Sequence, residues 1–343
     1  MRVLAPDGAL VEGAAPSMET SEIEEAMRLM VLSRAVDERA VGLQRQGRLG
    51  AYSPVIGQEA SVTGSAMALD PARDWVVPQY RELPAYLHQG LPLERLFLQW
   101  TGHVEGGHIP DSVRMLPIQI SIAAQIPQAA GLAWGLRLQG LDAVVVVYFG
   151  EGASSEGDFH EGMGIAGVTR APVIFFLQNN QYAISTPRHS QSAAPSLAAR
   201  GPGYGMPGHV VDGNDLLAVN AVTQAAVARA RAGEGPTLIE SQTYRMGPHN
   251  TSDNPARYED PELRARWAAL DPIDRVERYL VRVAGWDQSR RSELEGWARE
   301  EVERAHRVAM ELGGNRPEYL FEHVYADPPE RLLRERGRRL GGD

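Results

Sequence analysis

The chain has 343 residues, of which 43% are hydrophobic and 23% are charged, so it can bury the core of one large or two small folded domains. It contains no cysteine, which excludes disulfides, thiolate metal sites and a cysteine nucleophile. Its net charge of −10 and the scattering of its 34 basic residues, all arginine, argue against a general nucleic-acid binder.

The first residues, MRVLAPDGALVEG, contain no apolar export segment, and no apolar run approaches the roughly 20 residues that cross a bilayer. We therefore expect a soluble, cytoplasmic protein that contacts neither membrane nor nucleic acid. Residues 1–20 are rich in Gly, Pro and Ala and are predicted to form a flexible N-terminal arm. A helix is predicted from Ser21, because Ser21 and Glu24 match a capping box ahead of apolar residues at helical spacing.

The middle of the chain alternates apolar strands with helices. After a short strand in DWVVPQYRELPAYLHQG, three strands are predicted in DAVVVVYFG, APVIFFLQNN and PTLIESQTYR, with helices in DFHEGMGIAGVTR and VDGNDLLAVNAVTQAAVARARAG between them. Strands that are apolar throughout are buried on both faces, so we predict an α/β fold with a doubly wound, mostly parallel sheet. This core is predicted over residues 21–260, with a charged helical region over residues 261–343 packed on it.

Two polar residues follow consecutive strands of the predicted sheet. Glu151 stands between Gly150 and Gly152 after one strand, and Asn180 follows the next strand along the chain. Their separation is that of one βαβ unit, about 30 residues, so both side chains are expected at the carboxyl edge of the sheet, where ligands bind. A carboxylate and an amide oxygen there suit Mg²⁺, and the glycines let the backbone approach a phosphate. The alternative, a plain turn and a strand-ending cap, accounts poorly for this spacing.

Further motifs extend this pattern. FGEGASSEGD, NNQYAISTP, ARGPGYG, VDGND, TYRMGPHNTSD and QYRE together resemble the alpha subunit of the decarboxylating component of 2-oxo acid dehydrogenase complexes, and most of all its branched-chain subfamily. The resemblance covers residues 21 to 335. It implies the thiamine-diphosphate-binding fold with helical N- and C-terminal extensions. It also implies oxidative decarboxylation of a small 2-oxo acid and reductive acylation of a lipoyl group on an acyltransferase component.

The resemblance implies a metal and diphosphate site. Glu151 and Asn180 match residues that hold Mg²⁺ through side-chain oxygens, and Tyr182 matches one that binds it through the backbone carbonyl. Gly152 and Ala153 match residues whose backbone contacts the diphosphate. Glu151 is Asp in most thiamine-diphosphate enzymes, and the glutamate is a further hint of the branched-chain subfamily.

The resemblance also implies phosphate-binding and catalytic residues. Tyr80 and Arg81 match the pair that binds the terminal phosphate, a role that suits the fork-shaped guanidinium, and Gln178 matches a further polar contact there. His249 matches the active-site histidine, which either takes part in the chemistry or only bonds phosphate. Ile122 matches an apolar residue that packs against the cofactor and supports its bent shape.

The family pattern places the second half of the cofactor site on another chain. One doubly wound unit is visible in this sequence, with no second cofactor-binding domain of comparable size. We therefore predict an α₂β₂ heterotetramer with a beta subunit. Asn250 stands where mammalian relatives carry a serine that a kinase modifies, so no such switch is predicted. Ala124 stands where those relatives carry a potassium-binding threonine, which weakens any prediction of a potassium site.

Other functions stay open as alternatives. Pyruvate and acetoin dehydrogenase alpha subunits share the cofactor site. A nicotinamide oxidoreductase would need Gly-x-Gly-x-x-Gly after the first strand, which GEGASSEG only partly imitates. A non-catalytic scaffold subunit has no need of Tyr80, Arg81, Glu151, Asn180 and His249 together.

The remaining histidines have plainer interpretations. His103 and His108 have the spacing of two zinc ligands, but a loop near the active site or a subunit interface is the stronger expectation. His160 and Glu161 are predicted to be structural or interfacial, and Tyr204 is predicted to anchor a loop.

Overall fold

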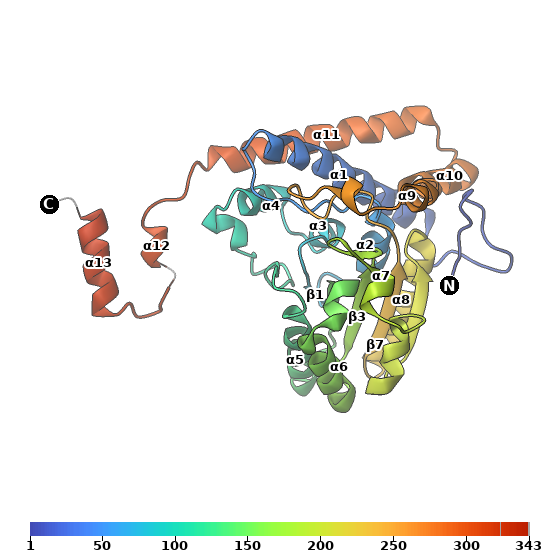
Figure 1. Cartoon of the computed structure of the whole chain (residues 1–343), viewed down its shortest axis with the longest axis horizontal. Coiled ribbons are helices and arrows are strands. Elements are labelled where there is room, and N and C mark those ends of the chain that lie inside the picture. Colours follow the sequence, from blue (N-terminus) through green and yellow to red (C-terminus); the bar gives the residue numbers. More distant parts are fainter. Residues whose placement is uncertain (323, 342–343) are drawn as a thin grey trace.

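A five-stranded, fully parallel sheet forms the centre of the chain in the computed structural model, which describes residues 1–322 and 324–341 (Figure 1). The strand order is β1-β2-β3-β7-β6, and a separate two-stranded hairpin consists of β4 and β5. This order confirms the predicted doubly wound α/β fold. The strands are β1 (Trp75–Val77), β2 (Val145–Gly150), β3 (Val173–Asn179), β4 (Tyr182–Ala183), β5 (Thr186–Pro187), β6 (Gly208–Asp212) and β7 (Thr237–Gln242).

Helices precede, connect and follow the strands. The α-helices are α1 (Thr20–Arg45), α2 (Glu59–Ala66), α3 (Leu83–His88), α4 (Leu93–Trp100), α5 (Gln125–Leu138), α6 (Gly157–Thr169), α7 (Arg188–Gln191), α8 (Leu216–Arg231), α9 (Pro261–Ala268), α10 (Pro272–Ala284), α11 (Gln288–Glu311), α12 (Tyr319–Glu322) and α13 (Glu330–Leu340). The 3₁₀ helices are η1 (Val104–Gly107), η2 (Glu151–Ser155), η3 (Ala198–Tyr204) and η4 (Pro255–Arg257). None of the described helices is long and apolar enough to cross a membrane.

The first helix begins slightly earlier than predicted. Its capping box is formed by Glu19 and Glu22 rather than by Ser21 and Glu24, and the Glu19 N–H donates to the Glu22 carboxylate at 2.7 Å. A carboxylate accepts these backbone hydrogen bonds as a serine hydroxyl does, so Glu19 and Glu22, two residues upstream of the predicted pair, cap the helix.

Alternate residues of each central strand enter two different hydrophobic cores. In β2, Val146 and Tyr148 pack with residues of α1, α2 and α8, whereas Val145, Val147 and Phe149 pack with residues of α5 and α6. Side chains of a strand point to opposite faces in turn, so both faces of the sheet are sealed. Burying each such side chain contributes about 1.5–3 kcal/mol. This packing holds the strand ends, and the loops that follow them, in place.

The N-terminal arm is docked rather than loose. Val3 and Leu4 are buried, and their N–H groups donate to the Asp215 carboxylate at 2.6 and 2.7 Å. The buried Arg275 donates to the Leu4 carbonyl and pairs with Asp215. The Gly- and Pro-rich composition that predicted flexibility thus forms turns that lie on the core.

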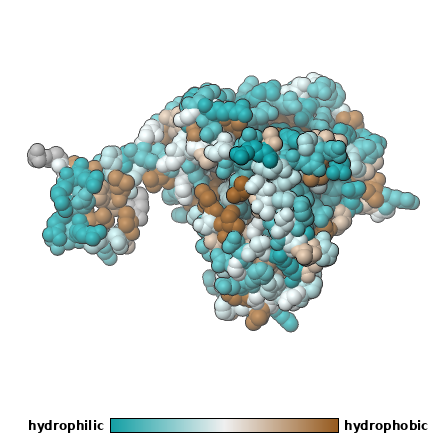
Figure 2. Space-filling view, in the orientation of Figure 1, coloured by the Kyte–Doolittle hydropathy of each residue, from teal (hydrophilic) through white to brown (hydrophobic). Residues whose placement is uncertain are grey.

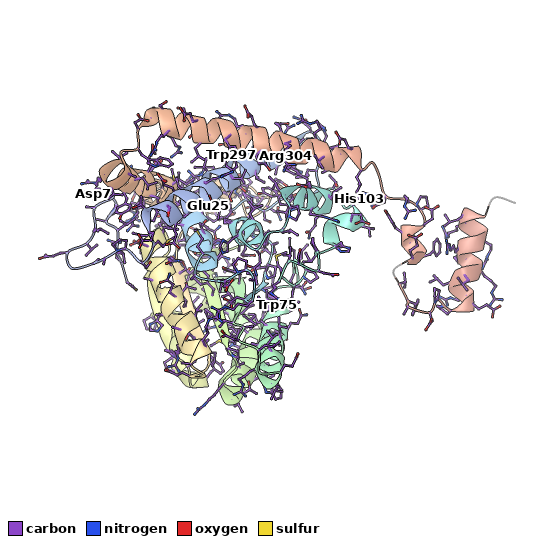
Figure 3. All side chains as sticks on the ribbon, turned by 180° about the vertical axis from the view of Figure 1, so that it is seen from behind. Asp7, Glu25, Trp75, His103, Trp297 and Arg304 are labelled. Carbon is purple, nitrogen blue, oxygen red and sulfur yellow. The ribbon has the colours of Figure 1, made fainter. Side chains whose placement is uncertain are left out.

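The C-terminal region divides into two parts. Helix α11 lies along α1, with the Arg28 guanidinium 4.0 Å from the ring centroid of Trp297 (Figure 3). Helices α12 and α13 instead project beyond the end of α11, away from the sheet (Figure 1). Apolar side chains are exposed on this projection (Figure 2), among them Leu320, Val324 and Leu333. Residues 261–343 were predicted to pack on the core as one region; α10 and α11 contact α1, whereas α12 and α13 project away from the sheet.

Candidate active site

The site lies at the carboxyl edge of the sheet, where β2 and β3 end side by side. Gly150 at the end of β2 pairs with Gln178 of β3, so Glu151 and Asn180 follow at neighbouring positions. One carboxylate oxygen of Glu151, Oε2, accepts a hydrogen bond from the Asn180 N–H at 3.2 Å. The juxtaposition expected from the crossover spacing is therefore present.

Glu151 is buried with half of its carboxylate unsatisfied. The residue is 1% exposed, and its Oε1 atom has no hydrogen-bond partner among the described residues. Burial raises the pKa of this carboxyl above its usual range. An ionised carboxylate in such a place is costly unless a cation faces it. The surroundings of Glu151 therefore fit a bound cation.

Two further oxygens accompany this carboxylate. The Asn180 Nδ2 atom donates to the Gln58 Oε1 at 3.0 Å, and its Oδ1 accepts one long hydrogen bond from the Tyr182 N–H at 3.4 Å and keeps a second lone pair. The Tyr182 carbonyl accepts from Arg245 at 3.1 Å and keeps a second lone pair. Hard oxygen donors of this kind suit Mg²⁺.

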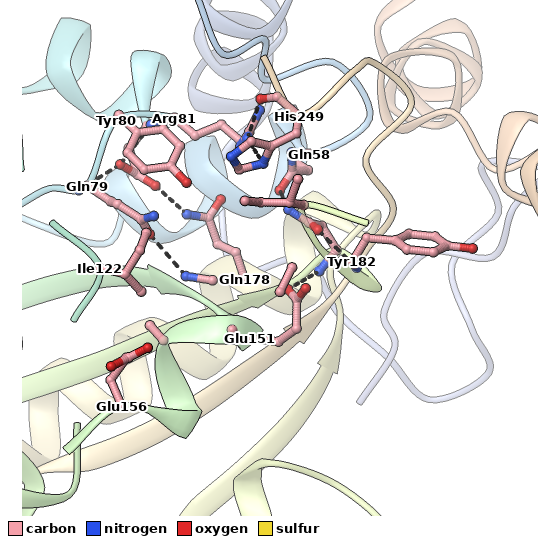
Figure 4. Close-up of a pocket in the computed structure, with 17 residues that line it drawn as sticks. Gln58, Gln79, Tyr80, Arg81, Ile122, Glu151, Glu156, Gln178, Tyr182 and His249 are labelled. Carbon is pink, nitrogen blue, oxygen red and sulfur yellow. Dashed lines mark hydrogen bonds between the residues drawn. The ribbon is translucent and has the colours of Figure 1, made fainter. Parts of the chain in front are cut away.

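Arg81 and Tyr80 lie on the opposite side of the pocket (Figure 4). The Arg81 guanidinium is buried, and it donates to the carbonyls of Pro54 at 2.5 Å and His249 at 2.9 Å. The rings of Tyr80 and His249 meet edge to face with centroids 6.1 Å apart. A permanent positive charge is thus held rigidly at this end of the pocket.

His249 stands between two guanidinium groups. Its Nδ1 atom is 3.4 Å from Arg81 and 3.5 Å from Arg245. Burial and, in the same direction, the charges of Arg81 and Arg245 together lower the pKa of His249 to about 4. Two donors at Nδ1 require that atom to accept, so the imidazole is neutral with its proton on Nε2.

A side-chain network holds the loop that carries this histidine. The His249 N–H donates to Asp253 at 2.8 Å, and the Tyr258 hydroxyl donates to the same carboxylate. Arg245 is fully buried and donates to the Tyr258 oxygen at 2.6 Å and to the Ile184 carbonyl at 2.7 Å. Arg245 is not among the residues predicted from the sequence, although it lies in the motif that contains His249.

Gln178 faces the pocket from the end of β3. Its Nε2 donates to the buried Glu82 carboxylate at 2.6 Å, and its Oε1 has no hydrogen-bond partner among the described residues. The other oxygen of Glu82 accepts from the N–H groups of Gln79 at 2.9 Å and Arg81 at 3.2 Å. Glu82 therefore links the strand end to the Tyr80–Arg81 segment, a role that residue type alone did not indicate.

All ten predicted site residues line one pocket of about 770 Å³, part of it open to solvent (Figure 4). Ile122 is 42% exposed on its rim. Gly150, expected from its place beside Glu151, also lines the pocket, and the lining residues that were not predicted from the sequence are Gln58, Gln79, Glu82, Glu156, Ala183 and Ile184. Gln58 precedes α2 and is 122 residues away from its partner Asn180 in the chain, so no local motif marks it.

The glycines of the Gly-Glu-Gly turn differ in their surroundings. A Cβ atom at Gly150 would meet nothing within 4 Å, so the space beside this pocket-lining residue is open. A Cβ atom at Gly152 would lie 2.7 Å from the Cβ of Ala183. The close approach at Gly152 is thus to this chain's own hairpin, and room for a ligand lies beside Gly150.

The other histidines lie outside this pocket. The His103 Nδ1 accepts from the Glu105 N–H at 3.2 Å, and within residues 1–322 and 324–341 no group of three or more His, Cys, Asp and Glu could hold a metal. The zinc alternative therefore has no support from the described residues. His160 bonds the Tyr204 hydroxyl and thereby joins α6 to η3, as expected of structural residues.

Comparison with known proteins identifies relatives over nearly the whole chain. The family model described as "Dehydrogenase E1 component" matches residues 27–318. "Pyruvate dehydrogenase E1 component subunit alpha" from Staphylococcus aureus (strain Mu50) is 42% identical over 337 residues, which cover 98% of this chain and 91% of that protein. The protein of the same name from Staphylococcus epidermidis (strain RP62A) matches equally well. These names favour the pyruvate alternative over the branched-chain subfamily that the motifs suggested.

Proposed function

This chain belongs to the dehydrogenase E1 component family, as an alpha-type chain of a 2-oxo acid dehydrogenase, and from that premise we propose that its pocket binds thiamine diphosphate with Mg²⁺ and that its substrate is pyruvate. The observation that carries the proposal is the buried, unsatisfied Glu151 oxygen, which lies in one pocket with Asn180 and the fixed guanidinium of Arg81. A metal-bound diphosphate needs oxygen ligands at one end and positive charge along its phosphates.

The metal would be held by Glu151, Asn180 and the carbonyl of Tyr182. Mg²⁺ typically takes few protein ligands and completes its coordination with phosphate oxygens and water, so three ligands from the chain suffice. The bound cation would compensate the negative charge of the buried Glu151 carboxylate.

The diphosphate would lie between this metal and Arg81. The residues proposed to contact it are Arg81 and Tyr80, Gln178, and the backbone of Gly152 and Ala153 at the start of η2. The open space beside Gly150 leaves room for the phosphates. Ile122, on the pocket rim, would shield the reacting part of the cofactor from water.

The bound cofactor supplies the electron sink for loss of CO₂. The chain itself contributes His249, a neutral hydrogen-bond donor that is held in a fixed position. With Nδ1 occupied by Arg81 and Arg245, His249 can donate only from Nε2, and its depressed pKa keeps it uncharged at neutral pH. We propose that His249 orients an anionic oxygen of substrate or cofactor through this N–H.

A branched 2-oxo acid is the second candidate substrate. A groove lined by Trp100, Ile118 and Ile120 among polar residues adjoins the pocket and shares Tyr80, Ile122 and His249 with it. Such a groove has room for a branched side chain, whereas pyruvate would leave it unfilled. The names of the relatives favour pyruvate, and the groove favours the larger acid.

The proposed partners are a beta subunit, in an α₂β₂ heterotetramer, and a lipoyl-bearing acyltransferase component. In support, the described residues form one five-stranded parallel sheet and one two-stranded hairpin, with no second parallel sheet among them. The chain purified alone is expected to show no decarboxylase activity, and activity without a second subunit would contradict the proposed assembly.

Co-expression with the beta subunit tests the function as a whole. The assembly is assayed with pyruvate and with 3-methyl-2-oxobutanoate, with an artificial electron acceptor and with or without thiamine diphosphate and Mg²⁺. The expected result is cofactor-dependent turnover with a higher kcat/KM for pyruvate. Preference for the branched acid would overturn the substrate assignment alone, and cofactor-independent behaviour would overturn the proposal.

A further inference from the structure

The segment from Tyr52 to Gln58 touches three separate parts of the pocket. The Pro54 carbonyl accepts from Arg81, and the Gln58 side chain accepts from Asn180. The segment also pairs with the histidine loop through Thr251, whose Oγ1 accepts from the Tyr52 N–H at 3.2 Å and whose N–H donates to the Tyr52 carbonyl at 2.9 Å. The conformation of this one segment therefore affects three parts of the pocket together: the proposed phosphate-binding part, the proposed metal-binding part and the histidine loop.

One carboxylate outside the pocket, that of Asp37, accepts three hydrogen bonds from this segment, and a second, that of Glu59, accepts one from the Gly57 N–H at 2.9 Å. Asp37, in the middle of α1, is 3% exposed and does not line the pocket. Its Oδ1 accepts from the Tyr52 hydroxyl and from the Val55 N–H at 3.1 Å, and its Oδ2 accepts from the Ile56 N–H at 2.7 Å. All three donors belong to the segment that contacts the pocket.

We propose that Asp37 is a positioning residue for cofactor binding, acting through the Tyr52–Gln58 segment; this inference rests on the proposed function. A carboxylate can accept from three donors at once, two on one oxygen and one on the other. Asparagine has the same shape but offers an NH₂ group to one of these donors, so one hydrogen bond becomes a contact between two N–H groups. The segment would then lose the arrangement that orients Arg81 and Asn180.

The charged form of Asp37 is costly in its buried position. Burial raises the pKa of Asp37 to about 7, and neighbouring Glu59 raises it too, against the hydrogen bonds from Tyr52, Val55 and Ile56. A carboxyl whose folded-state pKa is raised contributes less and less to stability as pH increases from its unfolded value through about 7. A residue that is costly at neutral pH and sits behind a pocket is a candidate for a functional role.

The chain contains a matched control for this residue. Asp74 is also fully buried and accepts from backbone N–H groups, those of Val144 and Asp70, both at 2.9 Å. It lies before β1, at the amino edge of the sheet, and pairs with Arg231 at 2.6 Å. Asp74→Asn therefore disturbs a similar buried anchor at the end of the sheet remote from the pocket.

The test compares the wild-type α/β assembly with its Asp37→Asn and Asp74→Asn variants. Thiamine diphosphate is titrated by calorimetry in the presence of Mg²⁺, and amide hydrogen exchange is measured on the cofactor-free assembly. Asp37→Asn is expected to raise the Kd about tenfold, equivalent to about 1.4 kcal/mol, and to speed exchange at Val55, Ile56 and Thr251. Asp74→Asn is expected to lower the melting temperature at least as much and leave the Kd and those amides unchanged.

Wild-type affinity and wild-type exchange in Asp37→Asn would overturn the positioning role. If that variant does not assemble, Tyr52→Phe removes one of the three donors, and an approximately threefold higher Kd with faster exchange at Val55 is expected; an unchanged Kd would overturn the inference. Failure of the wild-type assembly to bind thiamine diphosphate would instead overturn the proposed function, and the exchange measurement would still report whether Asp37 orders the segment.

Discussion

The two walls of the pocket are built in different ways. On the sheet wall, Glu151 and Asn180 are placed by the backbone pairing of β2 with β3. On the loop wall, His249 is placed by side chains, with Arg245 beside its Nδ1 and Asp253 holding its N–H. A backbone ladder positions residues by their spacing in the chain, whereas a side-chain network depends on contacts that spacing does not encode. A substitution on the sheet wall should remove a ligand of the proposed metal. A substitution on the loop wall should alter the position and charge of His249.

The largest expected effect comes from the sheet wall. Glu151→Gln keeps the size of the side chain but removes the buried negative charge that faces the proposed metal. We expect the affinity for thiamine diphosphate with Mg²⁺ to fall at least about 100-fold, measured by calorimetry on the α/β assembly. Glu156→Gln is the control, because Glu156 lines the same pocket but is exposed. Binding by Glu151→Gln within threefold of wild type would contradict the metal site.

A smaller effect, with a different signature, is expected on the loop wall. Arg245→Met removes the donors to Tyr182, Ile184 and Tyr258 and leaves the side chains of the proposed metal site intact. Turnover should fall about 10- to 100-fold because the histidine loop loses its fixed position. The pKa of His249 should rise from about 4, since one of two nearby positive charges is gone.

The measurement for this variant is kcat together with a proton NMR titration of His249. Arg264→Met is the control, because Arg264 pairs with Glu259 at 3.1 Å near the same loop but has no hydrogen bond to His249 among the described residues. An unchanged pKa of His249 in Arg245→Met would show that Arg245 does not set the charge of the histidine.

The two glycines that flank Glu151 should separate binding from stability. Gly150→Ala places a methyl group in open space beside the pocket, so the Kd of the cofactor should rise several-fold at unchanged melting temperature. Gly152→Ala brings its methyl group to 2.7 Å from the Ala183 Cβ and should destabilise the fold by about 1–3 kcal/mol. The second variant should be rescued by Ala183→Gly. If both variants changed the Kd and the melting temperature in the same way, the two glycines would not separate binding from stability.

The sheet, its two buried faces and the meeting of Glu151 with Asn180 could be predicted from sequence. Apolar strands alternate with helices, and one crossover sets the distance between the two residues. All ten predicted site residues line the same pocket. Gln58, Glu82 and Asp37 could not be predicted in this way, because each acts on a partner through folded contacts. The docking of the N-terminal arm could not be predicted for a similar reason, since Asp215 and Arg275, which bind the arm, lie in distant parts of the chain.

The smallest expected effect is a pH dependence of stability that originates on the loop wall. His249 is partly exposed, and its pKa falls from 6.5 to about 4 on folding, chiefly by burial. Between these values the unfolded chain binds the proton and the folded chain does not, so acidification favours unfolding. The stability contributed by the neutral histidine is therefore complete above pH 6.5 and is lost as pH falls towards 4. His249→Gln should reduce the slope of the unfolding free energy against pH in this window, measured by urea titration, and leave it unchanged above pH 7. Equal slopes would mean that His249 titrates normally and that Arg81 and Arg245 do not hold it neutral.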